Sequence, residues 1–217
     1  RPPRSTLFPY TTLFRSEMQD SATKEKLVSD MLKNVERLDM VVRDLNNILK
    51  VKADYNRARE HVNFQCLTDD VLQMTGSILE NQKIRIKTDF KDWEGMLTSR
   101  SYLHSVFYNL ILNSIKYKHP DRDLVLKITS TSNKEFNSLV FLDNGLGIKL
   151  GTNKEELFQL YKRQHLHIEG KGMGLFMVKT QLELIGGKIS IDSKLNEWTK
   201  VTIEFSNNNK NTDIENS

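Results

Sequence analysis

The first long pattern in the chain is a strict heptad of apolar residues between positions 28 and 49. No proline or glycine interrupts residues 21–56, and the apolar positions follow alternating steps of three and four. They are Val28, Met31, Val35, Leu38, Val42, Leu45 and Leu49. Such a seam is typical of a helix packed lengthwise in a coiled coil or an antiparallel bundle. The alternative is a helix that lies on its own domain, although such helices usually carry a wider apolar stripe.

Residues 67–205 mix helical and strand patterns. The periodicities predict helices at 67–81, 99–117 and 174–185, and strands at 84–89, 124–129, 138–142, 188–192 and 200–205. We expect a linker around 57–63 and a disordered polar tail from Ser206. Strands that alternate with helices but also form hairpin pairs predict an α+β fold. It should be a two-layer sandwich with helices on one face of a mixed sheet, preceded by the coiled-coil-type helix.

The composition excludes several classes of protein. Of the 217 residues 38% are apolar, and no run approaches the roughly 18 apolar residues that a membrane-spanning helix needs. A single cysteine, Cys66, rules out a disulfide scaffold and a multi-cysteine metal site, and we expect it to be buried. We therefore expect a cytoplasmic protein with no membrane segment in this stretch, and leave open an anchor further upstream.

The formal net charge of +4 comes mostly from residues 1–16. This segment holds Arg1, Arg4 and Arg15 and no acid, so without it the 32 basic residues fall to 29 against 28 acidic ones. Without this segment the chain is nearly neutral, so its charge does not indicate a nucleic-acid partner. Residues 6–16 look like a translated DNA-sequencing adapter, and we interpret 1–16 as a non-native leader. A genuine disordered arm is the alternative, whereas a secretory signal lacks its apolar core here.

Glycine gathers in two short motifs. Eight of the ten glycines fall between Gly145 and Gly187, and five of these eight lie in DNGLGI after a predicted strand and in GKGMGL before a predicted helix. Glycine lets the backbone approach a polyphosphate closely, and free N–H groups at a helix N-terminus attract its charge. Either motif alone is also compatible with an ordinary turn. Neither has the spacing of a Rossmann fingerprint or a P-loop.

Polar side chains with a defined spacing accompany these glycines. Asp143 ends an apolar strand, where its carboxylate could accept a hydrogen bond from an exocyclic amine such as that of adenine. Asn109 and Asn113 are four apart and share one helix face, with Lys116 one turn further on. An amide oxygen suits Mg²⁺, and a lysine can meet phosphate oxygens. An Asx-turn at Asp143 and solvated asparagines on a surface helix are the alternatives.

Four motifs in this order resemble a known family. NLILNSIKY, DNGLGI, ELFQLYKRQH and GKGMGLFMVKT are similar to the N, G1, F and G2 boxes in the ATP-binding domain of sensor histidine kinases. That domain shares its Bergerat, or GHKL, fold with gyrase, Hsp90 and MutL ATPases. The resemblance covers residues 63–205, and the heptad helix before them resembles the second helix of the kinase dimerisation and phosphoacceptor hairpin. It implies that ATP and Mg²⁺ bind here.

The resemblance also implies roles for individual residues. Asn113 would ligate Mg²⁺, Asn109 and Lys116 would contact phosphates, and Asp143 would bind the adenine amino group. A mobile lid would span residues 149–171, with Arg163 close to the γ-phosphate. The remaining residues implied at the nucleotide site are Tyr117, Gly145, Gly147, Ile148, Phe158, Gly170, Gly172, Met173, Gly174 and Leu175. Of these, the three glycines of GKGMGL would form the lid hinge, and Phe158 would steady the lid.

Two departures from related families shape the functional expectation. Hydrolysing members of the superfamily carry a glutamate as general base where this chain has Asn109, and an amide cannot take that proton. This favours phosphoryl transfer over hydrolysis.

None of the five histidines has the setting of a phosphoacceptor. They are His61, His104, His119, His165 and His167. We therefore expect the acceptor helix to be missing from this stretch, which alone should not phosphorylate itself.

The expected organisation is a leader at 1–16, the second hairpin helix at 17–58, the ATP-binding domain at 63–205 and a tail at 206–217. The expected partners are a second copy through the hairpin helices and the receiver domain of a response regulator, whose aspartate takes the phosphoryl group onward. Two other functions stay open at this point. One is an ATPase or protein-serine kinase of the same superfamily, and the other is a non-catalytic interaction module with a degenerate pocket.

Overall fold

The computed structural model describes residues 29, 59–76, 83–151, 154–159 and 173–207. The chain divides into two units, residues 1–54 and 55–217, and nearly all described residues belong to the second. The predicted heptad helix, the leader and the last ten residues of the tail lie outside the described residues. Among the described residues, no helix is long and apolar enough to cross a membrane.

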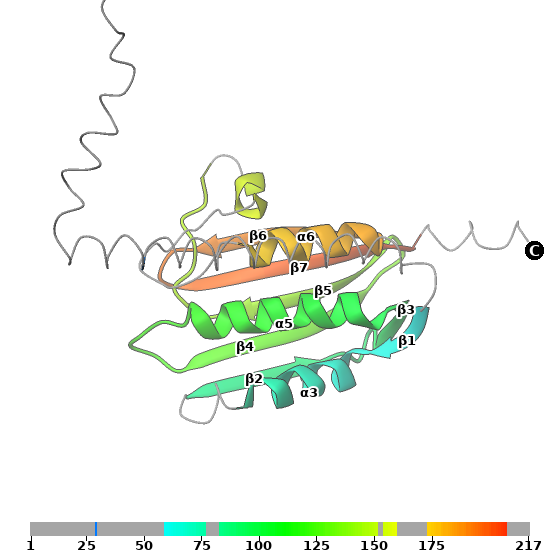
Figure 1. Ribbon diagram of the computed structural model, residues 1–217, viewed down its shortest axis with the longest axis horizontal. Helices are drawn as coiled ribbons and strands as arrows, with labels where there is room; N and C mark the ends of the chain where they lie inside the picture. Colours follow the sequence, from blue (N-terminus) through cyan, green and yellow to red (C-terminus); the bar gives the residue numbers. More distant parts are fainter. Residues whose placement is uncertain (1–28, 30–58, 77–82, 152–153, 160–172, 208–217) are drawn as a thin grey trace, which may run out of the picture. The chain divides into compact units, whose positions relative to one another are not determined.

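A five-stranded mixed sheet forms one layer of the second unit (Figure 1). Its strand order is β2-β4-β5-β7-β6, and only β2 and β4 run parallel. The strands are β2 (Ile84–Asp89), β4 (Leu124–Ser132), β5 (Phe136–Asp143), β6 (Gly187–Lys194) and β7 (Trp198–Ser206). Alternate residues of the central strands are buried, as expected for a sheet with one covered face.

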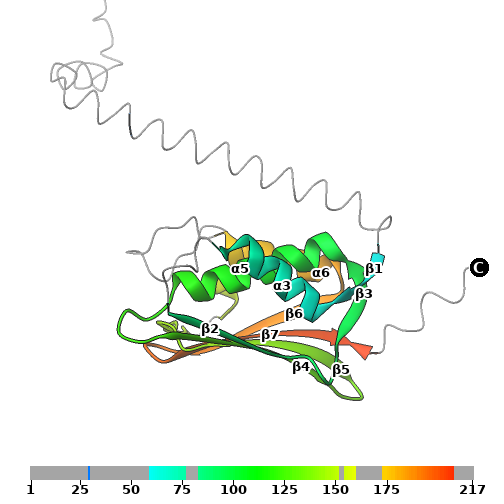
Figure 2. The same ribbon diagram turned by 90° about the horizontal axis from the view of Figure 1, so that it is seen from below.

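Within the described residues, three helices cover a single face of this sheet, as the side view in Figure 2 shows. They are α3 (Phe64–Met74), α5 (Arg100–Lys116) and α6 (Gly174–Leu184). The core between the layers centres on Phe107 of α5, whose ring lies 5.1 Å from that of Phe141 on β5 and 6.2 Å from that of Phe64 on α3. The predicted α+β sandwich is therefore confirmed.

A second, two-stranded sheet was not foreseen. Strand β1 (Arg59–Asn63) pairs antiparallel with β3 (Gly95–Ser99). The expected linker at 57–63 is therefore wrong over Arg59–Asn63. In β1 only Val62 is buried, so the polar sequence REHVN gives no alternating signal. The expected burial of Cys66 is also wrong, because this residue lies exposed on α3.

Element bounds differ from expectation mainly where polar residues continue a strand. The run Ser130–Asn137 was expected to separate two strands, yet its ends extend β4 to Ser132 and begin β5 at Phe136. Backbone pairing between Ser132 and Asn137 continues there while the side chains face solvent. Helix α3 begins at Phe64 rather than 67, because the side chain of Asn63 accepts a hydrogen bond from Cys66 N and caps it.

Candidate functional site

Asp143, the last residue of β5, lies half-buried beneath α5. Ser114 Oγ of that helix is 3.0 Å from Asp143 Oδ2, and Gly145 N donates to Asp143 Oδ1 at 2.9 Å. Burial of the carboxyl raises the pKa of Asp143, while the hydrogen bonds from Gly145, Ser114 and the Thr199 backbone oppose that rise. A carboxylate has about four lone-pair sites, so Asp143 keeps acceptor capacity for a further donor.

The loop after Asp143 has no room for side chains at two glycines. A Cβ added to Gly145 would lie 2.5 Å from Tyr117 O, and one added to Gly147 would lie 2.1 Å from Lys194 O. Gly147 also has a φ of +62°, which residues with a side chain rarely adopt. The chain therefore runs in contact with the end of α5 on one side and with the β6–β7 turn on the other.

Asn109 and Asn113 meet the start of α6. A Cβ added to Gly174 would lie 3.4 Å from Asn109 Oδ1 and 3.5 Å from Asn113 Nδ2. The N-cap residue of α6, Met173, provides no side-chain hydrogen bond to the first turn. The amides of α5 therefore lie against the electropositive N-terminus of α6, a combination of polar groups suited to an anion.

Asn109 has a fixed orientation. Its Nδ2 donates to Ser105 O at 2.8 Å, one turn back along α5, and this leaves Oδ1 on the side of Gly174. At the other end of the helix, Lys116 Nζ lies 5.1 Å from the centre of the Tyr117 ring. Both residues are half-buried, so the lysine charge is held beside the aromatic face rather than extended into solvent.

A short 3-10 helix, η1 (Lys154–Phe158), packs against α6. Phe158 is buried, and Lys179 of α6 places its Nζ 5.3 Å from the Phe158 ring while it pairs with Glu155. This anchors the early part of the expected lid to α6, the helix that follows the lid. Arg163, Gly170 and Gly172, with most of the expected lid, lie outside the described residues.

A groove of about 550 Å³ lies elsewhere, on the sheet face opposite the helices. Leu142 forms its floor, and the neighbouring strands place Lys127 and Lys200 on either side. Because these residues alternate with the buried Phe141 and Val201, they face away from Asn109 and Asn113. Asp143 and Asn144 also line this groove, whereas Asn109, Asn113 and Gly174 do not.

Comparison with known proteins decides the family. Residues 98–209, which include Asn109, Asn113, Asp143 and Gly174, match the family of histidine kinase-, DNA gyrase B-, and HSP90-like ATPases. The chain belongs to this family. The resemblance drawn from the four sequence motifs is thereby confirmed, and the described domain is an ATP-binding domain of the type found in sensor histidine kinases.

Individual relatives agree with this assignment. Sensor protein RprX of Bacteroides fragilis is 36% identical over 106 residues, which are 47% of this chain and 20% of RprX. Heme sensor protein HssS of Staphylococcus saprophyticus is 33% identical over 103 residues, 48% of this chain and 22% of HssS. The chain thus spans about a fifth of these relatives. The structure of Acinetobacter baumannii histidine kinase AdeS has the same fold, with a TM-score of 0.62 at 23% identity, covering 90% of this chain and 94% of AdeS.

Within the described part of this ATP-binding domain, the residues expected from the sequence form two clusters. Asn109, Asn113 and Gly174 come together at the α5–α6 contact, and Asp143, Gly145 and Tyr117 come together at the end of β5. Ser114, which contacts Asp143, was not foreseen as a site residue. Its only signal in the sequence is a hydroxyl on the otherwise apolar face of the 99–117 helix.

Proposed function

We propose that this chain is the catalytic part of a sensor histidine kinase, which moves the γ-phosphoryl group of ATP to a histidine of a dimerisation hairpin. In that step the bond from the γ-phosphorus to the bridging oxygen breaks, a bond to the imidazole nitrogen forms, and ADP leaves. The observation that carries the proposal is the contact of the two asparagine amides of α5 with Gly174 at the start of α6, on the same helix whose Ser114 donates to Asp143. An acceptor histidine is proposed to come from outside the described residues.

Asp143 suits the adenine end of the nucleotide. Its carboxylate is partly desolvated and already oriented by Ser114 and Gly145 N, so it does not need to reorganise to accept from an exocyclic amine. Gly145 and Gly147 let the loop pack directly against Tyr117 O and Lys194 O, and this fixes the backbone beside which a flat ring would lie. Tyr117 and Ile148 flank this loop and would border the ring.

Asn109, Asn113 and Lys116 suit the polyphosphate end. Asn113 Oδ1 is a hard oxygen of the kind that Mg²⁺ takes together with phosphate oxygens, and a bound Mg²⁺ would offset phosphate charge. Asn109 holds its amide toward Gly174 through Ser105, and Lys116 supplies a positive charge. Met173, Gly174 and Leu175 would offer backbone N–H groups to phosphates, and Arg163, Gly170 and Gly172 would serve the lid.

The identity of residue 109 favours transfer over hydrolysis. A general base that activates water must accept a proton near neutral pH, and an asparagine amide cannot do so. Asn109 Nδ2 is also occupied by Ser105 O, so its role is to bind rather than to exchange protons. The proposed setting is cytoplasmic. The proposed partners are a second copy, through the hairpin helices at 17–58, and a response regulator that receives the phosphoryl group on an aspartate.

Incubation with labelled ATP tests the function directly. The 217-residue chain should bind ATP, hydrolyse it slowly and remain unlabelled by itself. It should label a separately added hairpin that carries an acceptor histidine, and the label should be lost in acid but not in alkali, as expected for phosphohistidine. A hairpin with histidine replaced by glutamine is the control. Rapid hydrolysis without labelling of the hairpin would favour an ATPase, and labelled serine would favour a protein-serine kinase.

Replacement of Asn113 tests the metal role. Asn113→Ala should lower ATP affinity in the presence of Mg²⁺ by about tenfold or more, since even groups that only support a metal ligand commonly change metal affinity by that factor. Affinity measured with a chelator should change far less, because Asn113 would act through the metal. Calorimetry with and without Mg²⁺ gives both values. Asn137→Ala, at the opposite end of β5 from Asp143, should change neither. Equal losses under both conditions would exclude a ligand role for Asn113.

A further inference from the structure

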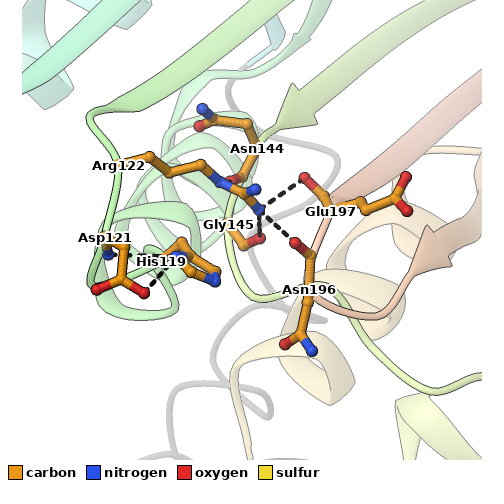
Figure 3. Close-up of polar contacts among 7 residues, drawn as sticks. All are labelled: His119, Asp121, Arg122, Asn144, Gly145, Asn196 and Glu197. Atoms are coloured by element: carbon orange, nitrogen blue, oxygen red, sulfur yellow. Dashed lines mark hydrogen bonds and ion pairs between the residues drawn. The ribbon is translucent and has the colours of Figure 1, made fainter.

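One arginine, Arg122, holds the loop that follows Asp143 (Figure 3). It lies at the surface in the turn between α5 and β4, and its Nε donates to Asn144 O at 2.7 Å. Its Nη2 donates to Gly145 O at 2.8 Å, to Asn196 O at 2.7 Å and to Glu197 O at 3.1 Å. Since Nη2 carries two hydrogens, at least one is shared between two carbonyls. A single guanidinium thus joins two segments about fifty residues apart in the chain.

The first of these contacts reaches Asp143 through a single peptide group. In the peptide that links Asn144 and Gly145, the carbonyl accepts from Arg122 Nε, and the N–H donates to Asp143 Oδ1 at 2.9 Å. A cation at the carbonyl end polarises a peptide group and strengthens the hydrogen bond that its N–H donates. Arg122 therefore orients the N–H group of Gly145 that donates to the carboxylate of Asp143.

The second contact holds the next peptide group in the same way. In the peptide that links Gly145 and Leu146, the carbonyl accepts from Arg122 Nη2, and the N–H donates to Tyr117 O at 2.8 Å. Gly145 packs so closely against the end of α5 that an added Cβ would lie 2.5 Å from the same Tyr117 O. Two consecutive peptide groups are thus oriented from both ends, with Arg122 on the carbonyl side of each.

The remaining two contacts attach the β6–β7 turn to the same loop. Asn196 N donates to Leu146 O at 2.6 Å, and Ile148 N donates to Ser193 Oγ at 2.8 Å, so the turn and the loop are also bonded directly. Asn144 adds a further tie, because its side chain accepts from Val125 N at 2.7 Å. The position of the loop at residues 144–148 is therefore set by its hydrogen bonds to Arg122 and to the segment around the β6–β7 turn.

The geometry points to Arg122 as a positioning residue for adenine recognition. By orienting the peptide groups on both sides of Gly145, it sets the position of the Asp143 carboxylate. Lysine cannot replace it, because an ammonium lacks the planar fork that reaches both segments. This inference rests on the proposed role of Asp143 in binding the adenine amino group.

Calorimetry of the 217-residue chain with ATP and with GTP tests the inference. Arg122→Ala and Arg122→Lys should each weaken ATP binding by about tenfold, the size of one charge-assisted hydrogen bond. GTP binding should change little, because guanine has no amino group at the corresponding position, so the ratio of ATP to GTP affinity falls. Arg100→Ala is the matched control: this arginine pairs with Asp70 at the opposite end of α5, and its loss should leave both affinities unchanged.

A double variant separates positioning from a general structural role. If Arg122 acts through Asp143, adding Arg122→Lys to Asp143→Asn should cause little further loss of ATP affinity, whereas independent effects would add. Thermal unfolding of each variant without nucleotide shows that the chain is folded at the temperature of the measurement. Arg122→Lys provides the test where Arg122→Ala does not fold.

Each outcome bears on one of the two proposals. Loss of ATP affinity in Asp143→Asn, with an unchanged ATP to GTP ratio in both Arg122 variants, would overturn the positioning role and leave the adenine assignment standing. Equal loss of ATP and GTP affinity in the Arg122 variants, or full additivity in the double variant, would also overturn it. Unchanged ATP affinity in Asp143→Asn would instead remove the adenine assignment on which it rests.

Discussion

Asp143→Asn is expected to weaken ATP binding by about 1.5–3 kcal/mol, the usual range for hydrogen bonds to a charged group. That corresponds to roughly 10- to 150-fold in the dissociation constant. An asparagine retains one carbonyl oxygen, but its NH₂ group would face the adenine amine as a second donor. Preference for ATP over GTP should fall as well. Isothermal titration calorimetry gives both quantities.

Asp89 provides a control with the same local structure. It ends β2 as Asp143 ends β5, and its Oδ1 accepts from the backbone N–H two residues later, at 3.4 Å. Asp89 is exposed, however, and lies on β2 at the edge of the sheet, whereas Asp143 lies on the central strand β5. Asp89→Asn should leave ATP affinity unchanged. Unchanged affinity in Asp143→Asn would place the adenine elsewhere.

Asp143→Asn should weaken ATP binding, but it should not weaken the stability of the fold in the absence of nucleotide. Burial raises the pKa of Asp143 in the folded state, so the folded state favours the protonated carboxyl. The contribution of a group with a raised pKa is fully present below its unfolded value, about 3.9, and is lost as pH rises through the folded value. At pH 7 the parent chain therefore bears the cost of a partly buried charge, which a neutral asparagine avoids.

Asp143→Asn should consequently be at least as stable as the parent at pH 7, and its advantage should shrink as pH falls toward 4. Urea unfolding at the two pH values measures this difference. A variant that is less stable by the same amount at both pH values would show that the hydrogen bonds from Ser114 and Gly145 outweigh desolvation. A gain in stability with a loss of binding would identify a residue kept for its ligand rather than for the fold.

Local patterns in the sequence predict those parts of the fold that they determine. Strand β2 was predicted with its observed bounds because IRIKTD alternates without interruption. Helix α5 was predicted within a residue at each end because its apolar face is continuous. Strands β1 and β3 escaped prediction because their pairing, rather than their side-chain pattern, makes them strands. Only Val62 and the two last residues of β3 are buried in that pair.

The residues of the candidate site likewise differ in whether a local sequence pattern identifies them. Asn109, Asn113, Asp143 and the glycines occur in recognisable motifs, so the sequence alone could single them out as candidate site residues. Arg122 belongs to no motif, and its acceptors lie 22 to 75 residues further along the chain. Its function depends on the turn between β6 and β7 returning to the end of β5, which only the assembled sheet brings about. Contacts of this kind carry no local signal in a single sequence.

Gly147→Ala is expected to produce the largest loss of stability among the substitutions considered. The φ of +62° alone costs a residue with a side chain about 1–2 kcal/mol. The new Cβ would lie 2.1 Å from Lys194 O, so the loop and the β6–β7 turn would also have to separate. That separation disturbs the hydrogen bond between Asn196 N and Leu146 O, and with it the position of Asp143. Both unfolding free energy and ATP affinity should therefore fall.

Gly76→Ala controls for the loss of a glycine as such, because a Cβ at that position meets nothing within 4 Å. Its effect on stability should stay within about 0.5 kcal/mol, as for most surface substitutions.

Urea unfolding of Gly147→Ala with and without saturating ATP then distinguishes two cases. If Gly147→Ala only strains the loop, ATP should still stabilise the variant, by an amount that reflects its weaker binding. If the loop and the turn come apart, ATP should give no stabilisation, because the proposed adenine site would require the β6–β7 turn to hold the loop. A variant as stable as the parent, with parental ATP affinity, would show that this contact does not hold the loop in solution.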